Sequence, residues 1–187
     1  MPKIVSELII SIDGYARGLQ SPAYYGFYGE EFGNWIESKN SKPHRNIMGR
    51  KTYEALNSLP VEFQDDSYKK MISTPGWLYS RTLKTTNWNL EIIQTDVCKH
   101  IQSVKHENGT EIRTLGSLSL VQQLLKLGLV DILRLIICPL VLPKTGIEPL
   151  FSEIPELQFE LLEHKVLDGR IIVLDYRPDG SPPYTRD

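Results

Sequence analysis

The pattern of hydrophobic and polar positions predicts strands that alternate with helices along most of the chain. Between Lys3 and Ile12, apolar side chains occupy both sets of alternating positions, which predicts a strand buried on both faces of a sheet. Apolar residues recur at helical spacing over 30–39, where Phe32 and Trp35 lie on one face. By the same reasoning, further strands are predicted at 46–48, 91–94 and 111–115, and further helices at 52–59, 96–105 and 116–128.

The second half of the chain ends in a predicted antiparallel hairpin. The most apolar run, 129–142, is predicted to be a central strand. Two later strands, 157–167 and 170–176, flank Asp168-Gly169, a dipeptide that favours a type I′ turn. The pattern therefore predicts an α/β fold with a mixed, mostly parallel central sheet flanked by helices and a C-terminal antiparallel hairpin.

Two further segments have a less regular pattern. The run 69–80 contains two short apolar stretches on either side of Pro75-Gly76, which fits one broken strand or two short ones. Residues 15–29 form a long loop rich in aromatic side chains, and loops of that length are usually functional or disordered. Residues 1–178 are expected to form one domain, and the proline-rich tail 179–187 is expected to fray.

Composition and charge argue against several classes of function. The 187 residues carry 21 basic and 23 acidic side chains without long blocks, so neither a nucleic-acid surface nor an acidic-membrane surface is indicated. The N-terminus lacks a signal-peptide pattern and no apolar run approaches the ~18 residues that span a bilayer, which favours a cytoplasmic protein. Cys98 and Cys138 are expected to be reduced thiols, and the four histidines are too scattered to suggest a metal site.

Three short motifs place small, hydroxylated or basic residues where an apolar run gives way to polar sequence: Gly49-Arg50-Lys51-Thr52, Ser80-Arg81-Thr82 and Gly116-Ser117. The carboxyl ends of parallel strands meet at one edge of a sheet, where helix N-termini offer free backbone N–H groups to phosphate oxygens. Each motif alone also fits an ordinary helix cap or polar turn. Together they indicate a dinucleotide, although the chain has neither a Gly-x-Gly-x-x-Gly nor a Walker-type motif.

Five ordered motifs resemble those of bacterial proteins in the dihydrofolate reductase-like superfamily, a group that includes the reductase domain of riboflavin biosynthesis. They are Ser11-Ile12-Asp13-Gly14-Tyr15, Met48-Gly49-Arg50-Lys51-Thr52-Tyr53-Glu54, Ser80-Arg81-Thr82-Leu83, Gly116-Ser117 and Gly128-Leu129-Val130-Asp131-Ile132-Leu133-Arg134-Leu135. The likeness covers about residues 3–176. It implies the dihydrofolate reductase fold, NADPH as hydride donor, a small-molecule substrate and, in many members, a homodimer.

The resemblance also implies cofactor contacts. They are Gly49, Arg50, Lys51 and Thr52 for the phosphates, Ser80 and Arg81 for the adenosine 2′-phosphate, with Thr82 as a further cofactor contact, and Leu115, Gly116, Ser117 and Leu118 under the pyrophosphate. An arginine fork flanked by hydroxyl groups suits a doubly charged phosphate, which favours NADPH over NADH. Many relatives have a second glycine where this chain has Ser117, and a side chain there limits how closely the backbone approaches a diphosphate.

Two carboxylates are candidate catalytic residues. By resemblance, Glu31 takes the position of the helix carboxylate that binds a pterin ring and favours its protonation, and Asp13 begins the loop that closes over the nicotinamide. Glu30 and Glu31 also fit the simpler role of acidic residues in a first helical turn. The aromatic side chains of 15–29 either stack on a flat heterocycle or belong to the core.

Three functions follow from these residues. The first is NADPH-dependent reduction of a pterin-like heterocycle, which Glu31 supports. The second is a 5-amino-6-(5-phosphoribosylamino)uracil reductase-type activity, which needs a further basic site for the substrate phosphate, with Lys144 or Arg17 as its candidates. The third is a nucleotide-binding protein without reductase activity.

Overall fold

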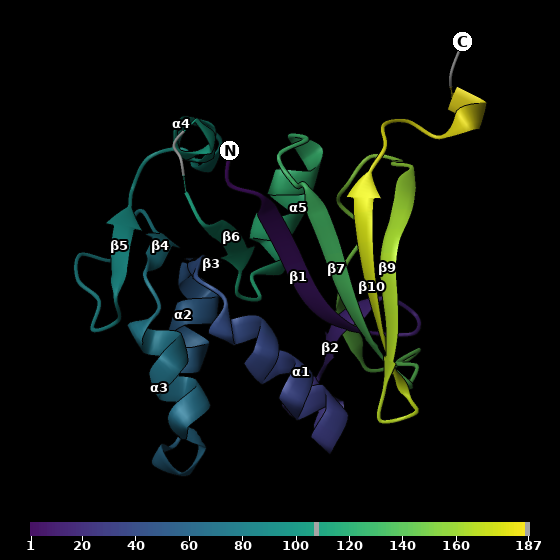
Figure 1. Ribbon diagram of the computed structural model, residues 1–187, viewed down its shortest axis with the longest axis horizontal. Coiled ribbons are helices and arrows are strands. Elements are labelled where there is room, and N and C mark those ends of the chain that lie inside the picture. The colour runs from purple at the N-terminus through teal and green to yellow at the C-terminus, as the bar shows by residue number, and fades with distance from the viewer. Residues whose placement is uncertain (107–108, 186–187) are drawn as a thin grey trace.

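The computed structural model describes residues 1–106 and 109–185. An eight-stranded sheet forms the centre of this part of the chain (Figure 1). Its strand order is β5-β4-β3-β6-β1-β7-β10-β9. The six strands from β5 to β7 are mutually parallel, whereas β10 is antiparallel to β7 and to β9. The bounds are β1 (Ile4–Ser11), β3 (His44–Gly49), β4 (Gly76–Tyr79), β5 (Leu90–Ile93), β6 (Glu111–Thr114), β7 (Ile132–Cys138), β9 (Phe159–Leu167) and β10 (Ile171–Pro178). This arrangement confirms the predicted mixed, mostly parallel sheet with a C-terminal antiparallel hairpin.

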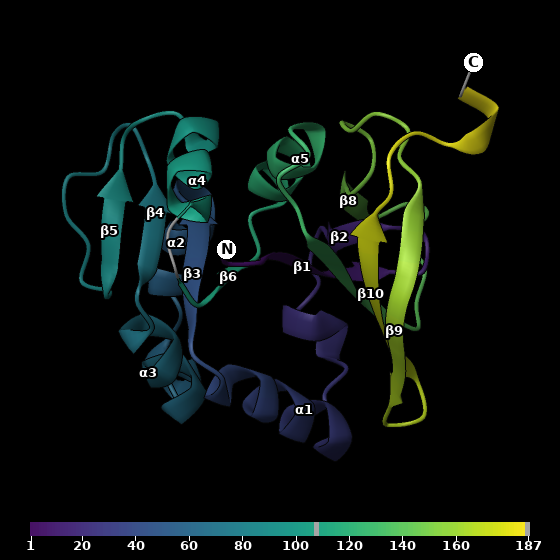
Figure 2. The same cartoon turned by 45° about the horizontal axis from the view of Figure 1, so that its top comes forward.

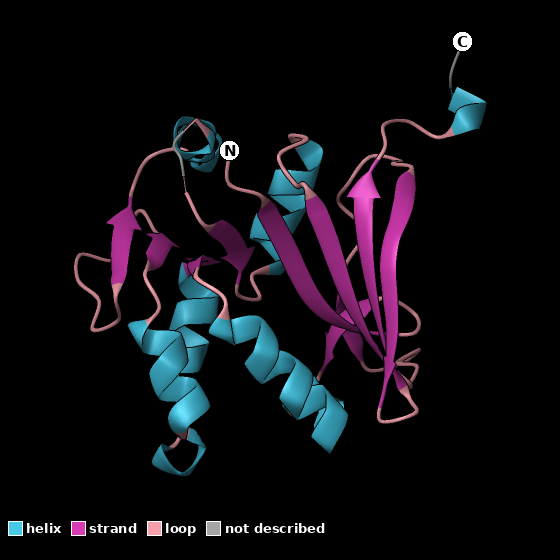
Figure 3. Cartoon of the chain, in the orientation of Figure 1, coloured by secondary structure: helices cyan, strands magenta, loops and turns pink. Residues whose placement is uncertain are grey.

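Five α-helices cover the two faces of the sheet in the described part of the chain. Three of them, α1 (Glu30–Ser41), α2 (Arg50–Asn57) and α3 (Asp66–Ser73), lie on one face, and α4 (Val97–Lys105) and α5 (Leu118–Lys126) lie on the other (Figure 3). The view in Figure 2 shows the same two layers from another side. None of these helices is long and apolar enough to cross a membrane.

The central strand β1 is buried on both faces, as its sequence predicts. Ile4, Leu8 and Ile10 belong to the hydrophobic cluster under α4 and α5, whereas Ile9 packs against the cluster around Phe32 of α1. A strand apolar on both faces has to be covered on both faces, and the two helical layers provide that cover.

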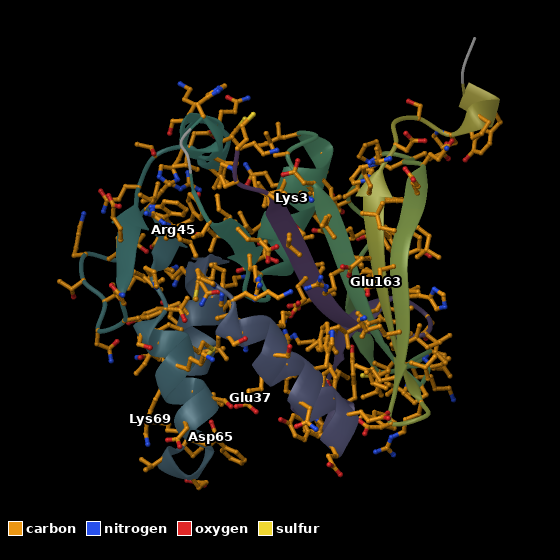
Figure 4. All side chains as sticks on the ribbon, in the orientation of Figure 1. Lys3, Glu37, Arg45, Asp65, Lys69 and Glu163 are labelled. Carbon is orange, nitrogen blue, oxygen red and sulfur yellow. The ribbon has the colours of Figure 1, made fainter. Side chains whose placement is uncertain are left out.

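The segment 69–80 corrects one prediction, because its first part is helical. Helix α3 occupies Asp66–Ser73, and only Gly76–Tyr79 is a strand. The carboxylate of Asp65 accepts a hydrogen bond from the backbone N–H of Tyr68 at 2.9 Å and caps the helix (Figure 4). The ring of Tyr68 meets Trp88 edge to face, at 5.9 Å between centroids. Tertiary packing thus selects a helix where the short apolar pairs alone suggested strands.

The structure also corrects the strand predicted over residues 129–142. Strand β7 is shorter than predicted, and a separate two-stranded sheet joins β2 (Tyr15–Gly18) to β8 (Gly146–Pro149). Part of the predicted aromatic loop is therefore a strand. Gly146 lies against the ring of Tyr15, where a Cβ would come within 2.5 Å of ring carbons, so only glycine allows this pairing.

The C-terminal hairpin turns at Asp168-Gly169 as predicted, but its register pairs Leu167 with Ile171, so three residues rather than two connect the strands. Asp168 and Gly169 have φ angles of 51° and 62°, the left-handed values that a type I′ turn requires at both positions. Beyond β10 the chain projects away from the sheet and includes a short 3₁₀ helix, Pro183–Thr185 (Figure 1). The last two residues of the predicted frayed tail, 186 and 187, lie outside the described residues.

Candidate functional site

The sheet topology defines one crevice where ligands bind most readily. Strands β1 and β6 are neighbours, but the chain leaves β1 through α1 towards β3, and leaves β6 through α5 towards β7 on the opposite side. In open α/β sheets, ligands bind outside the carboxyl ends of the strands at such a switch point. The turns that begin there are Asp13-Gly14 after β1 and Gly116-Ser117 after β6.

Two of the predicted phosphate motifs meet at this crevice. The hydroxyl of Ser117 accepts a hydrogen bond from the backbone N–H of Gly49 at 2.7 Å and shares another with Thr52 Oγ1 at 2.9 Å. A Cβ on Gly116 would lie 3.3 Å from the methyl group of Thr52, so the two turns are in van der Waals contact. Segments 65 residues apart in sequence are thus held together by one hydroxyl group.

The same contact brings two helix N-termini together. Helix α2 begins directly after Gly49, which has no side chain, and α5 begins directly after Ser117, whose side chain does not cap its own helix. The first-turn amides of a helix have no acceptor within that helix and carry the positive end of its dipole. The donor set of this crevice therefore suits the oxygens of a diphosphate.

The third motif lies beside the other two. Strand β4 pairs with β3 so that Tyr79 is opposite Gly49, which places Ser80 and Arg81 at the same edge. Ser80 is buried, and its Oγ accepts hydrogen bonds from the backbone N–H groups of Thr82 at 3.3 Å and Leu83 at 3.0 Å. Ser80 therefore shapes the turn, and Arg81 is exposed at its tip.

The basic side chains at the start of α2 differ in their surroundings. Arg50 forms an ion pair with Glu54 one turn along α2, with N–O distances of 2.9 and 3.1 Å, and both side chains are nearly half exposed. Lys51 is exposed. Leu115 and Leu118 pack their side chains into the hydrophobic clusters, so their backbones are the parts that remain for ligand contacts.

The candidate residues follow a linear order along the edge of the sheet. Strands β4, β3, β6 and β1 are successive neighbours, and they end at Arg81, the 49–52 turn, the 116–118 turn and Asp13. Three strand spacings of about 4.8 Å give roughly 15 Å from the first group to the last. An extended dinucleotide is a ligand of this length and charge pattern.

Asp13 ties the first loop to the segment that precedes β8. Its carboxylate accepts hydrogen bonds from the Ser11 hydroxyl at 2.6 Å and from the backbone N–H of Leu142 at 2.8 Å. The Ser11 hydrogen bond, followed by that of Leu142, lowers the pKa of Asp13. A carboxyl group of that kind stays ionised at neutral pH, so it suits loop positioning better than proton donation.

The family model described as the RibD C-terminal domain matches residues 2–173. The chain belongs to the RibD C-terminal domain family. This is the family of the riboflavin-biosynthesis reductase, within the dihydrofolate reductase-like group that the motifs predicted, and membership of it suggests an oxidoreductase.

Individual relatives of this RibD C-terminal domain are distant. Uncharacterized protein YyaP from Bacillus subtilis is 21% identical over 189 residues, which cover 95% of this chain and 96% of YyaP. A putative riboflavin biosynthesis protein from Shewanella sp. PV-4 has a TM-score of 0.69 and 18% identity, with 95% of this chain and 99% of that chain covered. A pyrimidine reductase-like protein from Corynebacterium diphtheriae has a TM-score of 0.65 and 17% identity, with coverage of 100% and 93%. At these identities the solved structures support the fold.

Glu31 lies at the far end of the same edge of the RibD C-terminal domain. Its carboxylate accepts a hydrogen bond from the backbone N–H of Asp168, in the hairpin turn. In return, the Asp168 carboxylate accepts hydrogen bonds from the backbone N–H groups of Glu31 at 3.0 Å and Phe32 at 3.2 Å. Strands β7 and β10 separate this pair from β1, so the structure does not bring Glu31 next to the phosphate motifs.

The aromatic loop divides into core and surface residues. Tyr24 and Phe27 pack with Phe32, and the Tyr24 and Phe32 rings meet edge to face at 5.3 Å between centroids. The Tyr25 hydroxyl donates to the backbone carbonyl of Tyr15 at 2.5 Å. Burial raises the pKa of both Tyr24 and Tyr25 to about 12, which keeps them neutral. Tyr28 is the exposed aromatic residue in this group.

Sequence reasoning missed Asp168 as a member of this region. Its position in a type I′ turn was visible, but the contact with α1 joins residues 137 apart in sequence. A local signal did exist at Gly29, where a Cβ would come within 2.4 Å of the Asp168 carboxylate atoms. A glycine directly before two acidic residues at a helix start is compatible with a close approach of this kind.

Proposed function

We propose that this chain is an NADPH-dependent reductase that delivers a hydride to a ribosylated pyrimidine of the kind reduced in riboflavin biosynthesis. The observation that carries the proposal is the linear order of Arg81, the 49–52 turn, the 116–118 turn and Asp13 along one edge of the sheet. Membership of the RibD C-terminal domain family supports a reductase of this pathway over a dihydrofolate reductase.

The residues present fit the cofactor in charge and in donor type. The amides at the start of α2 and α5 would hold the pyrophosphate, and Arg81 would hold the 2′-phosphate that distinguishes NADPH from NADH. When bound, NADPH supplies the hydride. The protein itself would orient the cofactor along the edge of the sheet, with the nicotinamide end towards the Asp13 loop.

The substrate phosphate needs a cation beyond those assigned to the cofactor. Arg17 on β2 forms an ion pair with Glu148 on β8 at 3.1 Å, and both side chains are about half exposed. Lys144 is exposed in the loop before β8. Both lie at the small sheet that continues from β1, so we assign the phosphate to this sheet, with Lys144 as the first contact.

Reduction of a C=N bond also needs a proton. Asp13 remains ionised at neutral pH, and we assign it to positioning the loop through Ser11 and Leu142. Glu31 is then the remaining candidate carboxyl group for proton transfer, a role that requires the substrate to reach from the Asp13 loop across the ends of β7 and β10 to the start of α1. The backbone N–H of Asp168 donates a hydrogen bond to the Glu31 carboxylate and fixes this side chain at the start of α1. An acid–base role requires an ordered carboxylate of this kind.

The test is NADPH oxidation with purified protein and two substrates, 5-amino-6-(5-phosphoribosylamino)uracil and dihydrofolate. The proposal expects turnover of the pyrimidine and little turnover of dihydrofolate. Faster turnover of dihydrofolate would instead establish the pterin reductase. NADPH binding, measured by fluorescence, without oxidation on either compound would identify a nucleotide-binding protein, and absence of NADPH binding would overturn the cofactor assignment.

A further inference from the structure

Helix α5 carries a polar side chain on its buried face. Leu120, Val121, Leu124 and Leu125 of this helix are buried in the apolar core, and Gln122 is buried among them. A buried amide costs free energy unless it is hydrogen-bonded, and a leucine at this position would continue the apolar face without that cost. The buried amide therefore indicates a role beyond packing.

The amide group of Gln122 binds the chain at the end of β8. Its Nε2 donates hydrogen bonds to the backbone carbonyl of Pro149 at 3.2 Å and to that of Leu150 at 3.0 Å. A primary amide nitrogen has two hydrogens, so this contact uses both of them. Figure 2 shows α5 beside β8, and Gln122 ties the helix to this segment.

The same segment is bonded to the loop that follows β1. The backbone N–H of Leu150 donates to the carbonyl of Gly14 at 2.9 Å, and Pro149 lies opposite Tyr15 in the pairing of β2 with β8. Two successive hydrogen bonds therefore connect Gln122 to Gly14, with Leu150 between them.

Glu148 has a strained backbone next to this contact. Its φ angle of 60° lies in the left-handed region, which a residue with a Cβ rarely adopts. Such a conformation persists only where the surrounding structure holds it. The two carbonyls that Gln122 binds belong to the next two residues, and the Glu148 carboxylate pairs with Arg17 of β2 at 3.1 Å. The contact therefore holds the part of the small sheet that presents Arg17.

We propose that Gln122 is a positioning residue that couples the two halves of the site. It fixes the β2–β8 sheet, to which the substrate phosphate is assigned, relative to the start of α5, to which the cofactor pyrophosphate is assigned. This inference rests on the proposed function. Gln122 follows Ser117 by less than two helical turns, about 7.5 Å along the axis, so one rigid stretch of α5 spans both contacts. Occupation of the first turn of α5 should therefore also restrain the small sheet.

Gln122→Met tests the coupling, because methionine has a similar length and no N–H donor. NADPH affinity, measured by fluorescence, should stay within about twofold, since the contacts of Ser117 are left intact. The single-turnover rate of NADPH oxidation with 5-amino-6-(5-phosphoribosylamino)uracil should fall about 10- to 100-fold, because a displacement of about 1 Å between reacting groups has an effect of this size. Gln123→Met, the same change at the exposed neighbour, should alter neither value. An unchanged rate in Gln122→Met overturns the proposal.

Asp131→Ala distinguishes positioning from a general loss of stability. The Asp131 carboxylate accepts hydrogen bonds from the backbone N–H of Ile4 at 2.8 Å and from Lys105 Nζ at 3.1 Å, at the amino ends of the strands. This variant should unfold at lower urea concentration and yet keep the wild-type rate while folded. If it slows hydride transfer as much as Gln122→Met does, lost stability explains both results and the proposal is wrong.

Hydrogen exchange tests the coupling without any substrate. The ligand is 2′-phosphoadenosine 5′-diphosphoribose, which has the phosphates of NADPH but no nicotinamide that could touch the loop after β1. In the wild type it should slow exchange of the β8 and Leu150 amides and of the first turns of α2 and α5, while α3 stays unchanged. In Gln122→Met only the two first turns should be slowed.

These measurements separate the coupling from the proposed function. Unchanged exchange of β8 in the wild type overturns the coupling without any variant, which keeps the test decisive if Gln122→Met does not fold. Equal slowing of β8 in both proteins overturns it as well. If β8 is slowed only in the wild type but the pyrimidine is not reduced, the proposed function fails and the coupling stands. Absence of ligand binding overturns both.

Discussion

Ser117 explains how a side chain is accommodated where relatives often have glycine. Its φ and ψ of 63° and 64° lie in the left-handed region, which costs a residue with a Cβ about 1 kcal/mol or more. The hydroxyl offsets this cost with hydrogen bonds to Gly49 and Thr52. The sequence raised the concern that this side chain obstructs a diphosphate, but the structure points it at the start of α2.

Replacing Ser117 separates these two effects. Ser117→Ala keeps the left-handed backbone but loses both hydrogen bonds, so it should reduce the free energy of unfolding by about 1–2 kcal/mol. Ser117→Gly should cost less, because glycine adopts this conformation without strain. Urea unfolding gives both values, with Ser119→Ala, an exposed serine on α5, as the control. If Ser117→Ala is as stable as that control, the hydroxyl does not hold the two turns together.

Arg81 is the residue that should distinguish NADPH from NADH. An arginine bound to a phosphate contributes about 1.5–3 kcal/mol, so Arg81→Ala should weaken NADPH binding by roughly 10- to 100-fold and leave NADH binding nearly unchanged. Fluorescence titration with both cofactors measures this difference. Lys84→Ala, an exposed cation three residues further on, is the matched control and should affect neither cofactor. Equal losses for NADPH and NADH would contradict a 2′-phosphate contact.

At the scale of elements, the reciprocal hydrogen bonds of Glu31 and Asp168 join the start of α1 to the turn of the hairpin. Asp168 caps the helix from another element, which is the task usually performed by a residue directly before the helix. Gly29 stands in that position and has no side chain to cap with. The contact fixes α1, and with it the end of the aromatic loop, against the sheet.

Glu31→Gln tests the proton-transfer role without breaking this contact. The glutamine carbonyl still accepts the hydrogen bond from the Asp168 N–H, so the free energy of unfolding should change by less than about 0.5 kcal/mol. Turnover should fall, while NADPH affinity is retained. Steady-state kcat and an NADPH binding titration measure this, with Glu30→Gln as the neighbouring control. Unchanged turnover in Glu31→Gln would show that the proton comes from elsewhere.

The elements themselves were largely predictable from local patterns. Strand β1 followed from apolar residues at both sets of alternating positions, and the hairpin from Asp168-Gly169 between two apolar runs. Helix α4 was also predicted, and Asp96 caps it through the N–H of Lys99 at 3.1 Å. Helix α3 was missed because its cap and its packing against Trp88 outweigh a weak local pattern. The β2–β8 pair was missed because it joins segments more than 120 residues apart.

At the scale of the whole molecule, a buried ionic network connects α1 to three strands. Lys39 of α1 contacts both carboxylate oxygens of Glu7 at 2.5 Å, and Arg134 of β7 lies 3.5 Å from the same carboxylate. Arg134 also forms a two-pronged contact with Asp175 of β10 at 2.6 and 2.7 Å. Trp35 packs beside both cations. The sequence did not predict this network, because Glu7, Arg134 and Asp175 are isolated charged positions within apolar runs and Lys39 lies in a polar segment far from them.

The candidate site was also predicted only in part from the sequence. The motifs predicted which residues meet at the sheet edge, because parallel strands place their carboxyl ends together whatever the details. They did not predict that Ser80 is buried in its turn or that Arg50 is paired with Glu54. Those outcomes depend on side-chain packing between elements, which local periodicity does not encode.

The ionisation of Glu7 makes the free energy of unfolding depend on pH in the acid range. Burial opposes its ionisation, but Lys39 and then Arg134 outweigh that effect and hold the pKa of Glu7 below its ordinary value of 4.5. A lowered folded-state pKa stabilises the fold above the ordinary value, and this contribution disappears as the pH falls through the lowered pKa. The wild-type chain should therefore lose stability below about pH 4.5 in part through Glu7.

Glu7→Gln should remove that part of the acid dependence and lower the free energy of unfolding at pH 7. The expected loss is about 3 kcal/mol, because the variant leaves Lys39 and Arg134 buried with one fewer negative charge. Urea unfolding at neutral and acidic pH measures both effects. Glu54→Gln breaks an exposed pair with Arg50 and should cost less than about 1 kcal/mol. If the two variants lose the same stability, the charges of Glu7, Lys39 and Arg134 are not coupled through the core, and α1 is held to the sheet by apolar packing alone.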